Sequence, residues 1–103
     1  MRVVALYHPK SDHEGIVLDY IRDYHMRSSG KEIEPISLET IEGSSMAELY
    51  DVTIYPAILA LSDDGQLQHF WQGIPLPLMN EIDAYSQDYD YNMAFAKAAL
   101  LSI

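Results

Sequence analysis

A β-hairpin in the second half of the chain is the feature that most limits its fold. Residues 57–61 form an uninterrupted apolar run, Ala-Ile-Leu-Ala-Leu, and the turn sequence Ser-Asp-Asp-Gly follows directly at residues 62–65. Residues 66–72 have the composition of a partner strand, and Gly73 closes the segment. Two strands joined by so short a turn pair antiparallel. We therefore expect this half of the chain to add an antiparallel pair to a sheet.

The first half of the chain predicts a strand followed by a helix. Residues 3–7 (Val-Val-Ala-Leu-Tyr) are all apolar, which is typical of a central strand covered on both faces. Residues 11–14 (Ser-Asp-His-Glu) match a capping box, in which Ser11 and Glu14 each satisfy a backbone amide, so we expect a helix to start there. Gly30 is the expected cap at its end. The side chains expected on the buried face of this helix are Val17, Tyr20, Ile21 and Tyr24.

Further strand and helix signals complete the order of elements. Residues 33–38 alternate apolar and polar side chains and predict a strand at or near an edge, because Pro35 has no N–H to donate. A second capping box at residues 45–48 predicts a short helix, and Pro77 predicts the start of a third. The third helix is expected to carry Leu78, Ile82 and Tyr85 on one side. A helix between the first two strands implies a right-handed parallel crossover, so the pattern predicts an α/β fold with a mixed sheet and helices on both faces.

Two stretches of the sequence resemble the thioredoxin-like fold family. Residues 49–56 (Leu-Tyr-Asp-Val-Thr-Ile-Tyr-Pro) resemble the stretch that thioredoxins place before their cis-proline, and residues 64–73 resemble their closing hairpin and the glycine after it. The resemblance extends over residues 1–86. It implies a three-layer sandwich with a central mixed sheet of about four strands. It also makes Pro56 the candidate for a cis peptide bond after Tyr55.

The chain departs from that family at the residues that carry its chemistry. Redox-active relatives start the first helix with Cys-x-x-Cys, whereas residues 11–14 here are Ser-Asp-His-Glu, and the whole sequence contains no cysteine. Disulfide exchange requires a thiolate nucleophile. The sequence therefore excludes thiol–disulfide oxidoreductase activity, and with it any zinc–thiolate or iron–sulfur site.

Composition limits the partners of this protein. Its 103 residues provide for a single hydrophobic core. Sixteen acidic residues against six basic ones give a formal net charge of −10, which repels phosphate backbones and anionic lipids. We therefore expect neither nucleic-acid nor membrane binding, and no cofactor. The sequence has no apolar run of about 18 residues and no signal-peptide pattern, so a cytoplasmic protein is expected.

The resemblance implies a groove beside Pro56. In thioredoxin-like proteins the residue before the cis-proline offers its backbone to an extended peptide, a form of strand addition. The candidate binding residues are Tyr55, Pro56, His8, Pro9, Ser11 and Asp12. On this interpretation the chain is a redox-inactive thioredoxin-like domain that acts as a protein-binding, peptide-binding or assembly module. The alternative is that Tyr55 and Pro56 only fix their loop and cover the core.

A second hypothesis concerns enzymatic or metal chemistry at the start of the first helix. His8, Ser11, Asp12 and His13 stand where the family holds its cysteines, and two imidazoles with a carboxylate are ligands for a divalent metal. Their positions in the sequence do not require these side chains to converge. We expect a loop without metal, and the sequence leaves the enzyme alternative open.

Residues 88–103 differ in character from residues 1–87, which form the expected domain. An acidic, tyrosine-rich stretch is followed by an alanine-rich segment with strong helix formers. We expect a C-terminal helix docked on the domain, because so short a helix would be marginal alone; the alternative is an exposed segment that binds a partner. Phe70 and Trp71 alternate on the last strand and are expected in the core. The position of Trp71 near the sheet edge leaves a homodimer open.

Overall fold

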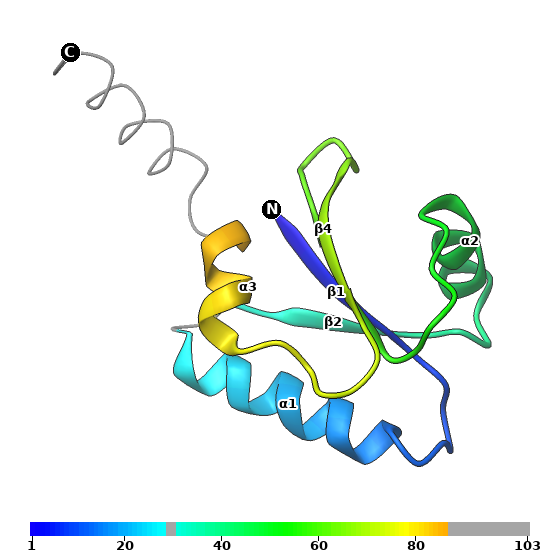
Figure 1. Cartoon of the computed structure of the whole chain (residues 1–103), viewed down its shortest axis with the longest axis horizontal. Coiled ribbons are helices and arrows are strands. Elements are labelled where there is room, and N and C mark those ends of the chain that lie inside the picture. The colour runs from blue at the N-terminus through cyan, green and yellow to red at the C-terminus, as the bar shows by residue number, and fades with distance from the viewer. Residues whose placement is uncertain (29–30, 87–103) are drawn as a thin grey trace, which may run out of the picture.

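In a computed structural model, described here for residues 1–28 and 31–86, the chain forms a four-stranded mixed sheet with three helices in this described part (Figure 1). The elements in order are β1 (Arg2–Tyr7), α1 (Glu14–Arg27), β2 (Ile33–Ser37), α2 (Ile41–Leu49), β3 (Ala57–Leu61), β4 (Leu67–Gln72) and α3 (Met79–Ser86). The α/β architecture predicted from the sequence is confirmed.

The sheet has the strand order β2-β1-β3-β4. β1 pairs parallel with β2, with Val4 opposite Glu34, and antiparallel with β3, with Val4 opposite Leu59. β3 and β4 form the predicted hairpin, whose turn is closed by a 2.9 Å hydrogen bond from Ser62 N to the Gln66 carbonyl. β2 lies at an edge of the sheet, as predicted from Pro35, which has no N–H to donate to a further strand.

Alternate residues of β1 serve two different layers of the core. Val3 and Ala5 belong to a cluster with side chains of α1 and α3, whereas Val4 and Leu6 belong to a cluster with side chains of α2 and its following loop. α1 and α3 thus cover one face of the sheet and α2 covers the other (Figure 1). The central position predicted for this strand is confirmed, since its residues 3–6 are buried on both faces.

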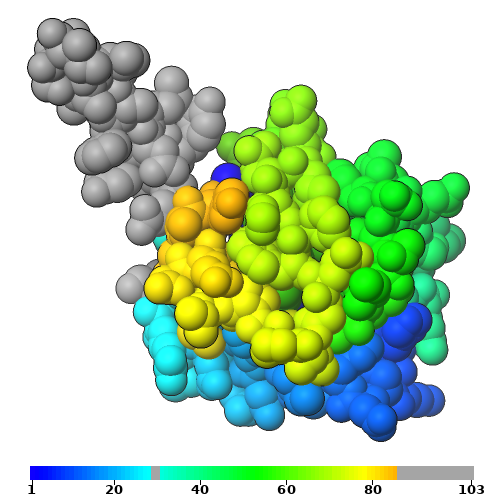
Figure 2. Space-filling view, in the orientation of Figure 1, coloured from blue at the N-terminus to red at the C-terminus, as the bar shows by residue number. Residues whose placement is uncertain are grey.

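The predicted apolar stripe of α1 faces the core. Val17 and Tyr24 are buried, and Tyr20 and Ile21 pack against the same cluster. The Tyr24 hydroxyl donates to Asp83 of α3 at 2.9 Å. The Tyr20 hydroxyl donates to the Pro77 carbonyl at 2.7 Å, which ties the segment between β4 and α3 to α1. Figure 2 shows this segment, in yellow, lying against the blue surface of α1.

The aromatic pair of β4 divides between the two faces of the sheet. Trp71 packs against the cluster that includes α1 and α3, and Phe70 packs against the cluster that includes α2. Both side chains are only half-buried, because β4 is an edge strand. The prediction that both belong to the core is confirmed in this weaker sense.

Three predicted helix boundaries are wrong. α1 begins at Glu14 with His13 as N-cap and no side-chain cap, because the Ser11 hydroxyl donates to the His8 carbonyl instead of accepting from the helix. α2 begins at Ile41 and not at Ser45, because the Thr40 hydroxyl accepts from Gly43 N at 3.0 Å. The third helix starts at Met79, so that Leu78 precedes it and is exposed, while Ile82 is fully buried as predicted.

Two sequence-based predictions lie outside the described residues. These are the cap at Gly30 and the C-terminal helix within residues 88–103. No helix of the described part is long and apolar enough to cross a bilayer.

Candidate functional site

The loop that precedes β3 is held by the end of β4. The Tyr55–Pro56 peptide bond is cis, and the carbonyl of Pro56 accepts a 2.8 Å hydrogen bond from Gly73 N. The side-chain oxygen of Gln72 accepts from the backbone N–H groups of Thr53 at 3.2 Å and Ile54 at 3.3 Å. One glutamine therefore satisfies two amides of a loop that has no regular secondary structure.

Tyr55 is fixed by its side chain while its backbone stays unpaired. Its hydroxyl donates to the Val52 carbonyl at 2.7 Å, and its half-buried ring packs against the core cluster on the α2 face. Within residues 1–28 and 31–86, neither the N–H nor the carbonyl of Tyr55 has a hydrogen-bond partner. The residue before Pro56 thus has a backbone donor and a backbone acceptor without a partner among the described residues, as residues of an unpaired strand edge do.

The structure brings His8 to Tyr55 across the two loops. The imidazole ring lies edge-on to the Tyr55 ring, with 5.1 Å between the ring centroids and an interplanar angle of 79°. This is the edge-to-face arrangement that aromatic pairs prefer. Pro9 follows His8 in the same loop and is half-buried. Pro56 itself is fully buried, so its role is to shape the loop and not to contact a ligand.

The loop between β1 and α1 is folded by contacts within itself. The Ser11 hydroxyl donates to the His8 carbonyl at 2.5 Å, and His8 N donates to Nε2 of His13 at 3.1 Å. Lys10, at φ +61°, provides the left-handed step that folds the chain back. Asp12 is exposed, and its carboxylate forms no hydrogen bond to any described residue. Ser11 therefore reaches Tyr55 only through His8, and Asp12 does not take part in this arrangement.

His13 is held as a neutral imidazole. A ring nitrogen that accepts a hydrogen bond carries no proton, so Nε2 is the unprotonated nitrogen. Burial lowers the pKa of His13 from its ordinary value of 6.5, and the neighbouring His8 lowers it further; the carboxylates of Asp12 and Glu14 act in the opposite direction.

The metal hypothesis has no support in this geometry. Among the described residues no three side chains of the metal-ligating types come together. The rings of His8 and His13 are 6.0 Å apart between centroids and tilted by 48°, and Nε2 of His13 is already engaged by a backbone N–H.

Sequence reasoning missed two parts of the surface around Tyr55 and His8, which is called the Tyr55 surface below. Gln72 ends a strand and gives no local signal that its side chain turns toward residues almost twenty positions earlier. Ile54 and Ile74 are exposed by 55% and 58%, and both adjoin Gly73. A Cβ built on Gly73 would lie 3.4 Å from a methyl group of Ile54. In the sequence these two isoleucines appear only as isolated apolar residues in loops, and nothing there indicates that they are exposed.

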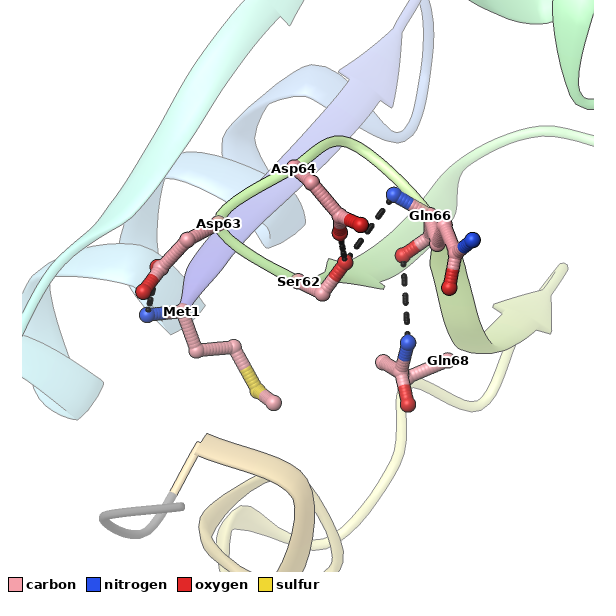
Figure 3. A pocket seen from close by; sticks show the side chains of 6 residues that line it. All are labelled: Met1, Ser62, Asp63, Asp64, Gln66 and Gln68. Carbon is pink, nitrogen blue, oxygen red and sulfur yellow. Dashed lines mark hydrogen bonds and ion pairs between the residues drawn. The ribbon is translucent and has the colours of Figure 1, made fainter. Parts of the chain in front are cut away.

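A separate pocket lies at the hairpin turn. It has a volume of about 400 Å³ and is lined by Met1, Ser62, Asp63, Asp64, Gln66 and Gln68 (Figure 3). The amino group of Met1 pairs with Asp63 at 2.7 Å, and Ser62 bonds to Asp64. This pocket is at the Leu61 end of β3, whereas Pro56 adjoins the Ala57 end. It does not belong to the Tyr55 surface.

Comparison with known proteins identifies the fold. No protein-family model matches the chain, and no curated protein matches it. The structure of thioredoxin 1 from the thermophilic eubacterium Thermosipho africanus is similar, with a TM-score of 0.62 and 16% sequence identity over 91% of this chain and 99% of that one. Likeness at this identity shows architecture alone. The chain has the thioredoxin-like fold, but it has none of the cysteines with which a redox thioredoxin works.

Proposed function

We propose that this redox-inactive domain is a binding module that takes up an extended peptide segment by strand addition at Tyr55. The observation that carries the proposal is the free N–H and carbonyl of Tyr55 beside Pro56. An extended chain laid against them gains two main-chain hydrogen bonds, which is how strand addition supplies affinity.

The rigidity of the surrounding loop supports this role. Tyr55 is tied to Val52 through its hydroxyl, and two preceding amides are tied to Gln72. A loop that is already ordered loses little conformational entropy when a peptide binds, so more of the interaction energy appears as affinity. The alternative role, in which Tyr55 only covers the core, accounts for the ring and its hydroxyl but not for the unpaired backbone groups.

The surroundings of Tyr55 suggest the chemistry of the peptide. Ile54, which precedes Tyr55 in the chain and lies against Gly73, is 55% exposed, and Ile74, which follows Gly73, is 58% exposed. Exposed apolar area of this kind suits apolar side chains in the bound segment. The net charge of −10 favours a partner that carries lysine or arginine, mainly through faster association. We therefore propose an apolar segment flanked by basic residues.

The test starts from a library of linear peptides displayed on phage and selected on the whole chain. Binding of the selected peptides is measured by calorimetry, and the site is mapped by amide NMR. We expect the Tyr55 amide to shift and its hydrogen exchange to slow, because a new main-chain hydrogen bond protects it. Selected peptides that bind while the Tyr55 amide keeps its exchange rate would contradict strand addition.

A pair of matched variants locates the side-chain contacts. Ile54→Asp places a charge in the proposed contact surface, whereas Ile41→Asp places one at an 86% exposed isoleucine of α2. We expect the first to weaken peptide binding about tenfold or more and the second to leave it unchanged. Equal effects of the two variants would mean that the peptide responds to net charge and not to this surface.

A further inference from the structure

We propose that His13 is a pH switch for the Tyr55 surface: the neutral imidazole holds the β1–α1 loop against Tyr55, and protonation releases it. The effect on peptide binding rests on the function proposed above, whereas the effect on the loop does not. The basis is a continuous series of contacts from His13 through His8 to Tyr55.

The first contact depends on the protonation state. Nε2 of His13 accepts from the backbone N–H of His8 at 3.1 Å. A protonated imidazole has an N–H at both nitrogens and no acceptor. Protonation therefore leaves two donors facing each other at 3.1 Å, and this contact cannot persist.

The second contact carries the change to the binding surface. The backbone of His8 is the partner of His13, and the ring of His8 is the partner of Tyr55 at 5.1 Å between centroids. The remaining anchor of His8 is the 2.5 Å bond from the Ser11 hydroxyl to its carbonyl. When His8 N loses its acceptor, His8 keeps one of its two hydrogen bonds, while the Leu38 N–H still holds the carbonyl of Tyr7 at 2.9 Å. The release is therefore local to His8, whose ring is then held less firmly beside Tyr55.

The groups around His13 decide which form dominates near neutral pH. It is the N-cap of α1, where the positive end of the helix dipole opposes a cation. His8, which directly follows β1, also opposes protonation, and Asp12 in the loop and Glu14 in α1 favour it. Tyr55 is the aromatic neighbour of His8 from the β3 side. Burial and His8 prevail, so the neutral form is the resting state at neutral pH.

The first test uses the free protein. The imidazole carbon signals of each histidine and the amide signals of His8 and Tyr55 are followed by NMR from neutral pH downward until the His13 ring signals reach their acid plateau. We expect both amides to shift with the midpoint of the His13 ring. In His13→Gln the amide oxygen keeps an acceptor that does not titrate in this range, so the inflection at Tyr55 is expected to disappear.

Two further variants complete the comparison. His13→Lys supplies a donor and a charge but no acceptor. We expect the amide chemical shift of Tyr55 in this variant at neutral pH to resemble the shift of the wild type at acidic pH. His25→Gln removes a histidine near the other end of α1, whose ring is 3.8 Å from Glu32, and is expected to change nothing at Tyr55. An inflection at Tyr55 that persists in His13→Gln, or follows the ring of His8, would overturn the proposal.

The second test adds a phage-selected peptide. We expect its Kd to rise about tenfold between neutral pH and the pH at which the His13 ring signals show it protonated, in the wild type and in His25→Gln, and to stay constant over the same range in His13→Gln. Constant affinity in the wild type would overturn the switch and leave the binding function standing. Absence of peptide binding at every pH, with the inflection of the free protein intact, would refute the binding function and leave the loop switch standing.

Discussion

A glycine-to-alanine substitution at Gly43 tests how α2 sits on the sheet. Alanine is usually better than glycine in a helix interior, by about 1 kcal/mol. At Gly43, however, an added Cβ would lie 2.1 Å from the carbonyl oxygen of Ser37 and 2.8 Å from its carbon. Both atoms are backbone, so relief requires α2 to move by about 1 Å away from the end of β2.

The magnitude follows from what that movement breaks. The Ser37 carbonyl accepts from Thr40 N at 3.1 Å and from the Thr40 hydroxyl at 2.6 Å, and that hydroxyl caps α2 through Gly43 N. Overpacking costs about 1–3 kcal/mol, and loss of a cap costs about 1 kcal/mol. After the gain in helix propensity of about 1 kcal/mol, we expect Gly43→Ala to lower the free energy of unfolding by about 2 kcal/mol.

The same chain provides the control. Gly15, in the first turn of α1, has no atom within 4 Å of an added Cβ, so Gly15→Ala is expected to raise the free energy of unfolding by up to about 1 kcal/mol. Urea unfolding monitored by circular dichroism measures both. For a domain of this size each kcal/mol corresponds to about 4–8 °C in Tm. If Gly43→Ala stabilises the protein as Gly15→Ala does, the close approach of α2 to β2 is refuted.

Three further predictions follow from particular contacts. Ile82 is fully buried between α3 and the sheet, so Ile82→Ala is expected to lower the free energy of unfolding by about 2–5 kcal/mol in urea titrations; a change below 1 kcal/mol would mean that α3 is not docked. Gln72→Leu removes the acceptor of two loop amides, so hydrogen exchange at Thr53 and Ile54 is expected to speed up while exchange in β1 stays unchanged; equal acceleration in both places would indicate global destabilisation instead. Because the native pKa of His13 lies below 6.5, the unfolded chain binds a proton first as the pH falls. The contribution of this group to stability is therefore lost progressively as the pH falls from about 6.5 to the native pKa, and below the native pKa the loss is complete and no longer changes with pH. The difference in unfolding free energy between wild type and His13→Gln, measured across that range, isolates this contribution, and a difference independent of pH would contradict it.

Much of the fold could be predicted from local sequence. The apolar residues 3–7 can be satisfied only inside a sheet covered on both faces, and the run at residues 57–61 with its Ser-Asp-Asp-Gly turn leaves little choice but a hairpin. Pro35 placed its strand at an edge because it has no N–H to donate. The absence of cysteine excluded disulfide chemistry whatever the fold. These features depend on residue type and short-range spacing, which the sequence contains in full.

Helix starts and the candidate surface depended on tertiary structure. Ser11, Thr40 and Ser45 each carry a hydroxyl that can accept a hydrogen bond from a helix amide. Which of them caps a helix depends on where the folded backbone directs those amides. The folded chain uses Thr40, and Ser11 donates to His8 instead.

The candidate surface itself is made by contacts between distant parts of the chain. His8 meets Tyr55, and Gln72 satisfies the loop before Pro56, only because β1, β3 and β4 lie side by side in the sheet. The sequence by itself determined the strands, the order of elements along the chain and the lack of thiol chemistry. The tertiary structure decided which polar groups are satisfied and which, like the backbone of Tyr55, stay without a partner among the described residues, because hydrogen-bond satisfaction depends on neighbours that only folding brings within reach.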